Sequence, residues 1–403
     1  MVFITSAKLN TIFKEFSRMP KPETLSLIEK LVSFDTTSRN SNLELISFID
    51  SYLSDLGVSC TLIHNAEKTK ANLYATIGPT DKPGIMLSGH TDVVPVDGQD
   101  WHNDPFEVVQ GPDRLFGRGT CDMKGFIAIC LAYAPEFLKQ KLTTPIHFAF
   151  SYDEEVGCIG VHSLLDMLKG MPIKPAMCIV GEPTNMNVAV GHKGIHSYIA
   201  TVRGLEAHSS LTPQGVNTIE YAADLITYLK SMVARFAKEG PFDDAYDITH
   251  TTVHTGLIQG GVTVHIVPRD CSFEFEFRNL SEHNAKGIIE EIRRYANEQL
   301  VPAMKAISPV AGIEVRDNIH VPGLSTHVDA NVVTFVKSLA GRNDHIKVAF
   351  GTEAGLFDEH VGIPTVVCGP GSIEQAHKPD EYITLDQVSQ CEQFMERLID
   401  KVR

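Results

Sequence analysis

The stretch Ile146-His147-Phe148-Ala149-Phe150-Ser151-Tyr152-Asp153-Glu154-Glu155 joins a short apolar run to two adjacent carboxylates. Three more apolar runs of similar length occur in the first part of the chain, at 72–77, 84–88 and 176–180. Their length and apolar continuity are typical of strands that are covered on both faces. Apolar residues at helical spacing occur before these runs, at 25–32 and 46–56. The pattern predicts an α/β sandwich around a largely parallel or mixed sheet.

Polar residues follow these runs where the strands are expected to end. His90, the pair Glu154 and Glu155, and Glu182 each come shortly after one of the runs. Ligands and catalytic groups in open α/β sheets gather beyond the carboxyl ends of strands, so we expect these residues to share one rim. Because adjacent carboxylates point in different directions, one of the pair can hold a metal while the other handles a proton.

The pattern changes at about residue 188. Side chains at 195–202 alternate in polarity. A second alternating stretch has its phenylalanines on one face and its polar residues on the other: Ser272-Phe273-Glu274-Phe275-Glu276-Phe277-Arg278. This is typical of an antiparallel sheet with one wet face. With helical patterns between the strands, the order β-α-β-β-α-β predicts a small sheet with two helices on one face.

Buried-strand patterns return at 345–350 and 364–368. The small domain is therefore predicted to be inserted into the large one. We expect a first catalytic segment at 1–187, an inserted domain at 188–317 and a second catalytic segment at 318–403.

Composition limits the possible partners. The chain has 403 residues, and its 50 acidic against 35 basic residues give a formal charge of −15, which disfavours binding to nucleic acid or to an anionic membrane. The start of the chain lacks a signal-peptide pattern, and no apolar stretch is long enough to span a membrane. The eight cysteines are scattered without a Cys-x-x-Cys pair. These features predict a cytoplasmic protein that acts on small molecules.

Imidazole and carboxylate groups of the kind that bind zinc are present in five candidate positions. A carboxylate shared between two ions, with one histidine and one glutamate for each ion, would use all five. Such a pair of metals, about 3.5–4 Å apart, polarises a carbonyl group and lowers the pKa of a shared water to about 7. The candidates are His90, Asp122, Glu155, Glu182 and His377.

Five segments resemble the successive metal-site motifs of the M20 metallopeptidase family. The order and context of the motifs match over most of the chain. The resemblance implies a zinc-exopeptidase-like α/β/α catalytic domain with an inserted α+β, ferredoxin-like dimerisation domain, and a homodimer. The segments are His90-Thr91-Asp92-Val93-Val94-Pro95, Gly117-Arg118-Gly119-Thr120-Cys121-Asp122-Met123-Lys124-Gly125, Asp153-Glu154-Glu155-Val156-Gly157, Gly181-Glu182-Pro183-Thr184 and Ala376-His377-Lys378-Pro379-Asp380-Glu381.

The resemblance also assigns the metal ligands. It implies that Asp122 bridges two Zn²⁺ ions per chain, with Co²⁺ able to substitute. His90 and Glu182 would complete one metal position, and Glu155 and His377 would complete the other. Taken singly, each of these residues has an ordinary structural explanation, such as a turn, a cap or a solvated charge.

Other residues are assigned roles beside the metals by the same resemblance. Asp92 would orient the His90 imidazole, and Glu154 would be the general base. His208, within Gly204-Leu205-Glu206-Ala207-His208-Ser209-Ser210, would reach into the neighbouring subunit's site and stabilise the oxyanion. Arg278 would grip a substrate carboxylate, although it could instead pair with Glu276 or Glu274.

Within the family, residues 151–158 and 350–357 most resemble the acetylornithine deacetylases. The implied reaction is hydrolysis of N2-acetyl-L-ornithine to ornithine and acetate in arginine synthesis. Thr352 would line the substrate side of the site, and Glu353 would meet a ligand ammonium or have a structural role. His265 occupies a position where the family usually has a substrate-recognising asparagine.

Several alternatives use the same metal chemistry: a succinyl-diaminopimelate desuccinylase, an aminoacylase or a carboxypeptidase. A non-catalytic metal-binding homologue is a further alternative, against which the presence of Glu154 argues because a binding module needs no proton shuttle.

Overall fold

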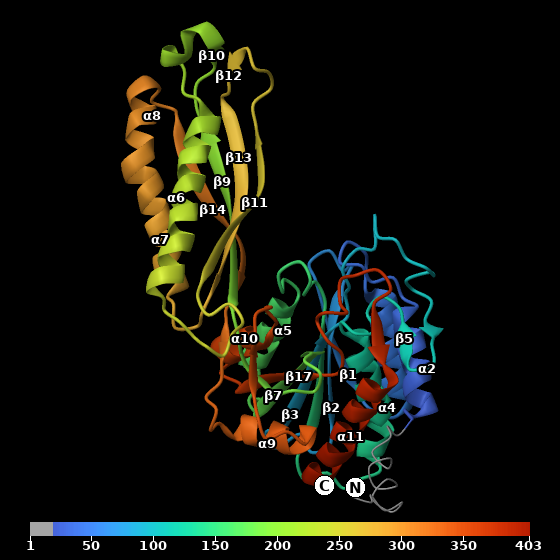
Figure 1. The fold of residues 1–403 in the computed structure, drawn as a ribbon. Coiled ribbons are helices and arrows are strands. Elements are labelled where there is room, and N and C mark those ends of the chain that lie inside the picture. Colours follow the sequence, from blue (N-terminus) through green and yellow to red (C-terminus); the bar gives the residue numbers. More distant parts are fainter. Residues whose placement is uncertain (1–18) are drawn as a thin grey trace, which may run out of the picture. The chain divides into compact units, whose positions relative to one another are not determined.

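The computed structural model describes residues 19–403, so the N-terminal stretch used to predict the lack of a signal peptide lies outside the described residues. The chain divides into two compact units (Figure 1). The first unit extends to Val190 and includes Thr326–Ile346 and Thr352–Arg403. The second unit comprises Gly191–Ser325 and Lys347–Gly351. The inserted domain predicted from the sequence covers 188–317. No described helix is long and apolar enough to cross a membrane.

A mixed sheet forms the centre of the first unit, in the strand order β1-β2-β6-β3-β7-β17-β8. Strands β6, β3, β7 and β17 run parallel to one another. At one side of the sheet β2 pairs antiparallel with β6, and β1 pairs antiparallel with β2. The predicted mixed sheet is therefore confirmed. The strands are β1 (Cys60–His64), β2 (Ala71–Ile77), β3 (Ile85–His90), β6 (Ile146–Ser151), β7 (Met177–Pro183), β8 (Ala189–His192) and β17 (Thr365–Gly369).

Helices cover both faces of this sheet, which confirms the predicted α/β/α arrangement. One face shares a continuous apolar core with α2, α3, α4, α9 and α11. On the other face, the buried Asn72 of β2 donates to Ser163 in α5, and α10 contacts β7 and β17. The helices are α2 (Pro22–Val32), α3 (Leu43–Asp55), α4 (Lys124–Leu138), α5 (Val161–Gly170), α9 (Asn331–Ala340), α10 (Ala354–Leu356) with the π-helix η4 (Phe357–Val361), and α11 (Leu385–Val402).

Short strands make up the remaining pairings. A three-stranded sheet has the order β18-β5-β4, from β18 (Tyr382–Thr384), β5 (Arg114–Phe116) and β4 (Val109–Gln110). It joins the last part of the chain to the segment that precedes Asp122. The short strands β15 (Leu324–Ser325) and β16 (Ile346–Val348) occur where the chain passes from one unit to the other.

The second unit contains the predicted order β-α-β-β-α-β, and its four-stranded antiparallel sheet has the order β11-β13-β9-β14. Helices α6 and α7 pack on one face (Figure 1). As predicted, Phe273, Phe275 and Phe277 are buried in that core. The main elements are β9 (Gly194–Arg203), α6 (Thr218–Glu239), β11 (Thr252–Gly260), β13 (Asp270–Asn279), α7 (Ala285–Tyr295) and β14 (Gly312–Val321). Smaller elements are β10 (Ala207–His208), the 3₁₀ helix η2 (Ser209–Gln214), β12 (Ile266–Val267), the π-helix η3 (Ala296–Leu300) and α8 (Val301–Ile307).

Candidate metal centre

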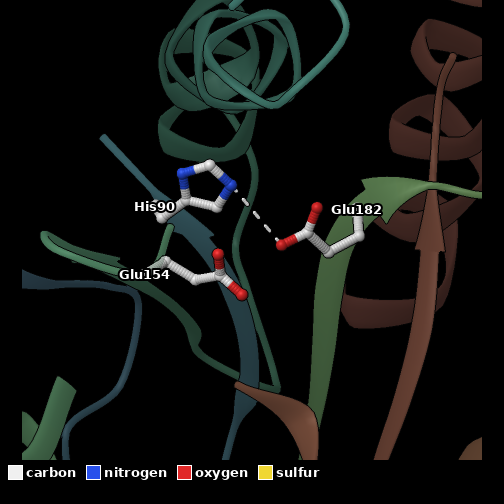
Figure 2. Close-up of side chains that lie close together, drawn as sticks. All are labelled: His90, Glu154 and Glu182. Atoms are coloured by element: carbon white, nitrogen blue, oxygen red, sulfur yellow. Dashed lines mark ion pairs between the residues drawn. The ribbon is translucent and has the colours of Figure 1, made fainter. Parts of the chain in front are cut away.

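Three neighbouring strands of the first unit bring the polar residues to one rim. His90 is the last residue of β3 and pairs in register with Ser151, the last residue of β6. Glu182 lies near the end of β7, which is parallel to β3. Figure 2 shows the side chains of His90, Glu154 and Glu182 pointing toward one another. The expected gathering of these residues beyond parallel strands is thus seen in the structure.

The first group of ligand atoms surrounds the buried imidazole of His90. Its Nε2 lies 3.0 Å from Asp122 Oδ1 and 3.5 Å from Glu182 Oε1. Its Nδ1 lies 2.9 Å from the backbone carbonyl of Asp92. Because a carbonyl only accepts hydrogen bonds, Nδ1 donates to Asp92, and Nε2 is the ring nitrogen that faces the two carboxylates.

The second group surrounds His377. Its Nε2 lies 3.2 Å from Asp122 Oδ2 and 3.1 Å from Glu155 Oε2. The two oxygens of Asp122 therefore face two different imidazoles, one in each group. This is the arrangement expected of a carboxylate that bridges two metal positions.

The pKa shifts of these groups indicate a site that favours bound positive charge. Burial raises the pKa values of Glu155 and Glu182, and the charge of Asp122 raises them further. Burial alone would raise the pKa of Asp122 as well, but hydrogen bonds from His377 and His90 hold it below its ordinary value. Hydrogen bonds to Asp122 and Glu155 raise the pKa of His377 to about 10. These carboxylates thus need positive charge beside them.

The residues fit zinc. Ligand atoms of His90, Asp122 and Glu155 lie within 4.8 Å of one another, as do those of His90, Glu154 and Glu182. Lone pairs of neutral imidazoles cannot face carboxylate oxygens at about 3 Å unless a proton or a cation lies between them. Imidazole nitrogen and carboxylate oxygen are ligands that Zn²⁺ accepts.

Asp92 contacts the site in two ways. Its carboxylate accepts hydrogen bonds from the backbone N–H groups of Glu154 and Glu155, at 3.1 and 3.2 Å, and from the Ser38 hydroxyl at 2.7 Å. Its Oδ1 lies 3.6 Å from His90 Nδ1, so the carbonyl, rather than the carboxylate, makes the close contact to the imidazole. Asp92 therefore holds the turn from which Glu154 and Glu155 diverge.

Glu154 is partly buried and makes no hydrogen bond to either imidazole in the described residues. Burial raises its pKa well above the ordinary value, and the Cys158 thiol lies 3.5 Å from its Oε1. Glu155, in contrast, contacts His377 directly. The adjacent glutamates therefore occupy different surroundings, as a division between proton transfer and metal binding requires.

Three of the predicted residues belong to the second unit. His208 is exposed, and its Nδ1 accepts a hydrogen bond from the backbone N–H of Ser210. His265 lies close by, because its carbonyl accepts the N–H of Ser209 at 3.1 Å. Arg278 donates from Nε to Glu276 at 2.9 Å, the alternative pairing named above. The substrate and oxyanion roles of these residues stay predictions.

Thr352 and Glu353 lie in the first unit and are buried. The Thr352 hydroxyl accepts the N–H of Ala354 at 3.0 Å. Burial raises the pKa of Glu353 to about 7, and its charge in turn acts on Glu154. The contact of Glu353 with a ligand ammonium stays a prediction.

Three residues beside the ligands had no role in the sequence prediction: Gln99, Arg118 and Glu381. Glu381 accepts three backbone N–H groups of the turn that carries Asp122. Arg118 and Glu381 fall inside two of the motif segments, so their position was a usable signal. Gln99 lies outside every motif, and only its contacts identify it.

The chain is similar to known proteins over most of its length. Residues 86–401 match the model of peptidase family M20/M25/M40. The chain is 32% identical over 369 residues to an acetylornithine deacetylase from Photorhabdus laumondii, covering 91% of this chain and 92% of the relative. It is 31% identical over 388 residues to an acetylornithine deacetylase from Edwardsiella ictaluri, covering 94% and 97%.

Solved structures share the fold. An M20 family metallo-carboxypeptidase from Sulfolobus solfataricus aligns with a TM-score of 0.73 at 20% identity, covering 94% of this chain and 99% of that one. The aminopeptidase PepT from Bacillus cereus aligns with a TM-score of 0.72 at 20% identity, covering 95% and 99%. With the family match and the close relatives, the chain is a metal-dependent hydrolase that belongs to peptidase family M20/M25/M40.

Proposed function

We propose that the chain is a di-zinc amidohydrolase that removes the acetyl group from N2-acetyl-L-ornithine, giving L-ornithine and acetate. The observation that carries the proposal is Asp122, whose two carboxylate oxygens face the imidazoles of His90 and His377. The substrate comes from the curated relatives, which are named acetylornithine deacetylase. The reaction would serve arginine biosynthesis, and the cytoplasmic location stays a prediction.

The residues of the chain divide the work of hydrolysis. His90, Glu182 and Asp122 would hold one Zn²⁺, and Asp122, Glu155 and His377 the other. Bound zinc supplies polarisation of the acetyl carbonyl and a water whose pKa is lowered to about 7. Glu154 would take the proton from that water and deliver it to the leaving amine, since it has no competing hydrogen bond to either imidazole among the described residues.

Acetylornithine is expected to be the preferred substrate. The measurement is kcat/KM for N-acetyl, N-formyl and N-succinyl amino acids beside dipeptides, with zinc or cobalt supplied. We expect N2-acetyl-L-ornithine to exceed the other compounds by about tenfold or more, because a site that pairs with a substrate's polar groups rejects compounds that lack them. A tenfold preference for a dipeptide or an N-succinyl substrate would reject this substrate and leave the metal chemistry standing.

The proposal includes a homodimer that pairs through the second unit. Exposed apolar side chains gather on β11 and the loop after it: Leu257 is 64% exposed, Ile258 56%, Val262 97% and Val264 84%. Strand β11 is also an edge of its sheet, with unpaired backbone groups. Such apolar exposure on a sheet edge is typical of a protein interface.

Mixing two inactive variants tests whether His208 serves the partner's site. His208 belongs to the second unit, whereas every proposed metal ligand belongs to the first. If His208 acts across a dimer, a mixed dimer of His208→Ala and Glu154→Gln chains has one site with both lesions and one with neither. Random exchange of subunits should then restore up to about a quarter of wild-type activity. No recovery despite demonstrated exchange would place His208 in its own chain's site or outside catalysis.

A further inference from the structure

The turn that presents Asp122 is built around one buried carboxylate. Glu381 Oε1 accepts the backbone N–H groups of Gly119, Cys121 and Asp122, at 3.0, 2.9 and 3.1 Å. Glu381 is 1% exposed. This carboxylate fixes the conformation of the turn, because losing the acceptor would leave three backbone N–H groups without a hydrogen-bond partner.

Arg118 connects this carboxylate to a second loop. Its guanidinium is fully buried and donates from Nη1 to Glu381 Oε2 at 2.6 Å and from Nη2 to Gln99 Oε1 at 2.6 Å. The planar fork of arginine allows one group to bind two acceptors in a set geometry. Arg118 therefore ties Gln99 to the Asp122 turn.

The orientation of the Gln99 amide follows from these contacts. Its Oε1 accepts from Arg118 and also from Trp101 Nε1 at 2.9 Å. With the oxygen held on that side, Nε2 faces the other way and donates to the backbone carbonyl of His377 at 2.9 Å. A continuous set of contacts thus runs from the backbone of Asp122 to the backbone of His377 without using a metal-ligating atom.

The two metal positions differ in how their histidines are held. His90 ends a central strand, and its ring is fixed by the carbonyl of Asp92. His377 lies in a loop, with a φ of 61° in the left-handed region and a side chain that is 48% exposed. A ligand on a loop depends on neighbouring contacts for its position far more than a ligand on a strand does.

We propose that Gln99, oriented by Arg118, is a positioning residue for His377 and sets the affinity of the metal position formed by Asp122, Glu155 and His377. The position formed by His90 and Glu182 does not depend on Gln99. This inference rests on the proposed two-metal site. It adds a residue that touches neither metal nor substrate and acts through the backbone of a ligand.

The test is an isosteric substitution, Gln99→Glu. The carboxylate keeps the size of the amide and still accepts from Arg118 and Trp101, but its oxygen replaces the N–H group that faces the His377 carbonyl. Gln390→Glu is the matched control, because Gln390 donates to Asp386 on the exposed side of α11. Gln99→Ala is the second variant, which removes the contact without adding a charge.

The measurement is the stepwise affinity for Zn²⁺ and Co²⁺, by competition with a chromophoric chelator, together with the melting temperature of the metal-free protein. In both Gln99 variants we expect one ion to bind about 10–100-fold more weakly and the other to bind unchanged, as is usual when a residue supporting a ligand is lost. The metal-free melting temperature of Gln99→Glu should stay that of wild type, because its carboxylate still accepts from Arg118 and Trp101, and both affinities of Gln390→Glu should be unchanged.

Three kinds of result would overturn the proposal. Unchanged affinities in both Gln99 variants, with two ions bound by wild type, would reject the role of Gln99 alone. An equal loss at both positions, or a lower melting temperature of metal-free Gln99→Glu, would show that Gln99 supports the fold rather than one ligand. Wild-type protein that binds a single ion would reject both this inference and the two-metal function, which separates the two failures.

Discussion

Replacing Asp122 with alanine is expected to remove both metal ions and to abolish hydrolysis. The two oxygens of Asp122 lie 3.0 Å from His90 Nε2 and 3.2 Å from His377 Nε2, so one side chain serves both positions. Without it, each position keeps only one histidine and one glutamate, too few protein ligands for the usual zinc site. Turnover should fall by about 10⁴-fold or more, because loss of the metals removes both activation of water and polarisation of the carbonyl.

The measurements are metal content per chain after reconstitution with zinc, and turnover of acetylornithine. Wild type should approach two ions per chain. Asp113→Ala is the matched control, since Asp113 is an exposed carboxylate that pairs with Arg114 and lies in the same region of the chain. Full activity in Asp122→Ala would end the bridging hypothesis.

Glu154→Gln is expected to keep its zinc and to lose about 10²–10⁴-fold in turnover, the usual scale for removing a general base. Glu154 makes no hydrogen bond to either imidazole in the described residues, so the amide should leave the metal positions intact. Glu155→Gln is the natural comparison: its carboxylate lies 3.1 Å from His377 Nε2, and the variant should weaken metal binding as well.

Metal content and kcat of the two variants together decide the assignment. Near-native turnover in Glu154→Gln would remove Glu154 from proton transfer. Loss of zinc in Glu154→Gln to the same degree as in Glu155→Gln would instead make both residues ligands.

The fold was predictable where apolar and polar side chains follow the periodicity of a strand or a helix. The apolar run at 146–150 became β6, and the alternation of 272–278 became part of β13, because these strands are covered on two faces and one face respectively. Helix α4 escaped prediction. It is buried on almost every side, so its apolar residues have no helical period to detect.

The site was predictable as a set of residues but not as a set of contacts. The motifs named the five candidate ligands, and all five lie together in the structure. Arg118 and Glu381 were inside two of those motifs, yet they are 263 positions apart in the chain. Nothing in either segment shows that their side chains form a buried ion pair.

The fold class and the family could be predicted from local periodicity and from short motifs whose residues are neighbours in the chain, and the same motifs predict the types of the metal ligands. The contacts within the site became visible only in the folded chain: Asp92 contacts His90 through its carbonyl, Glu353 is buried, and Gln99 reaches the backbone of His377. The physical reason is that these contacts depend on which strand ends and loops meet at the rim. That meeting is fixed by sheet order and packing over the whole unit, which no short segment encodes.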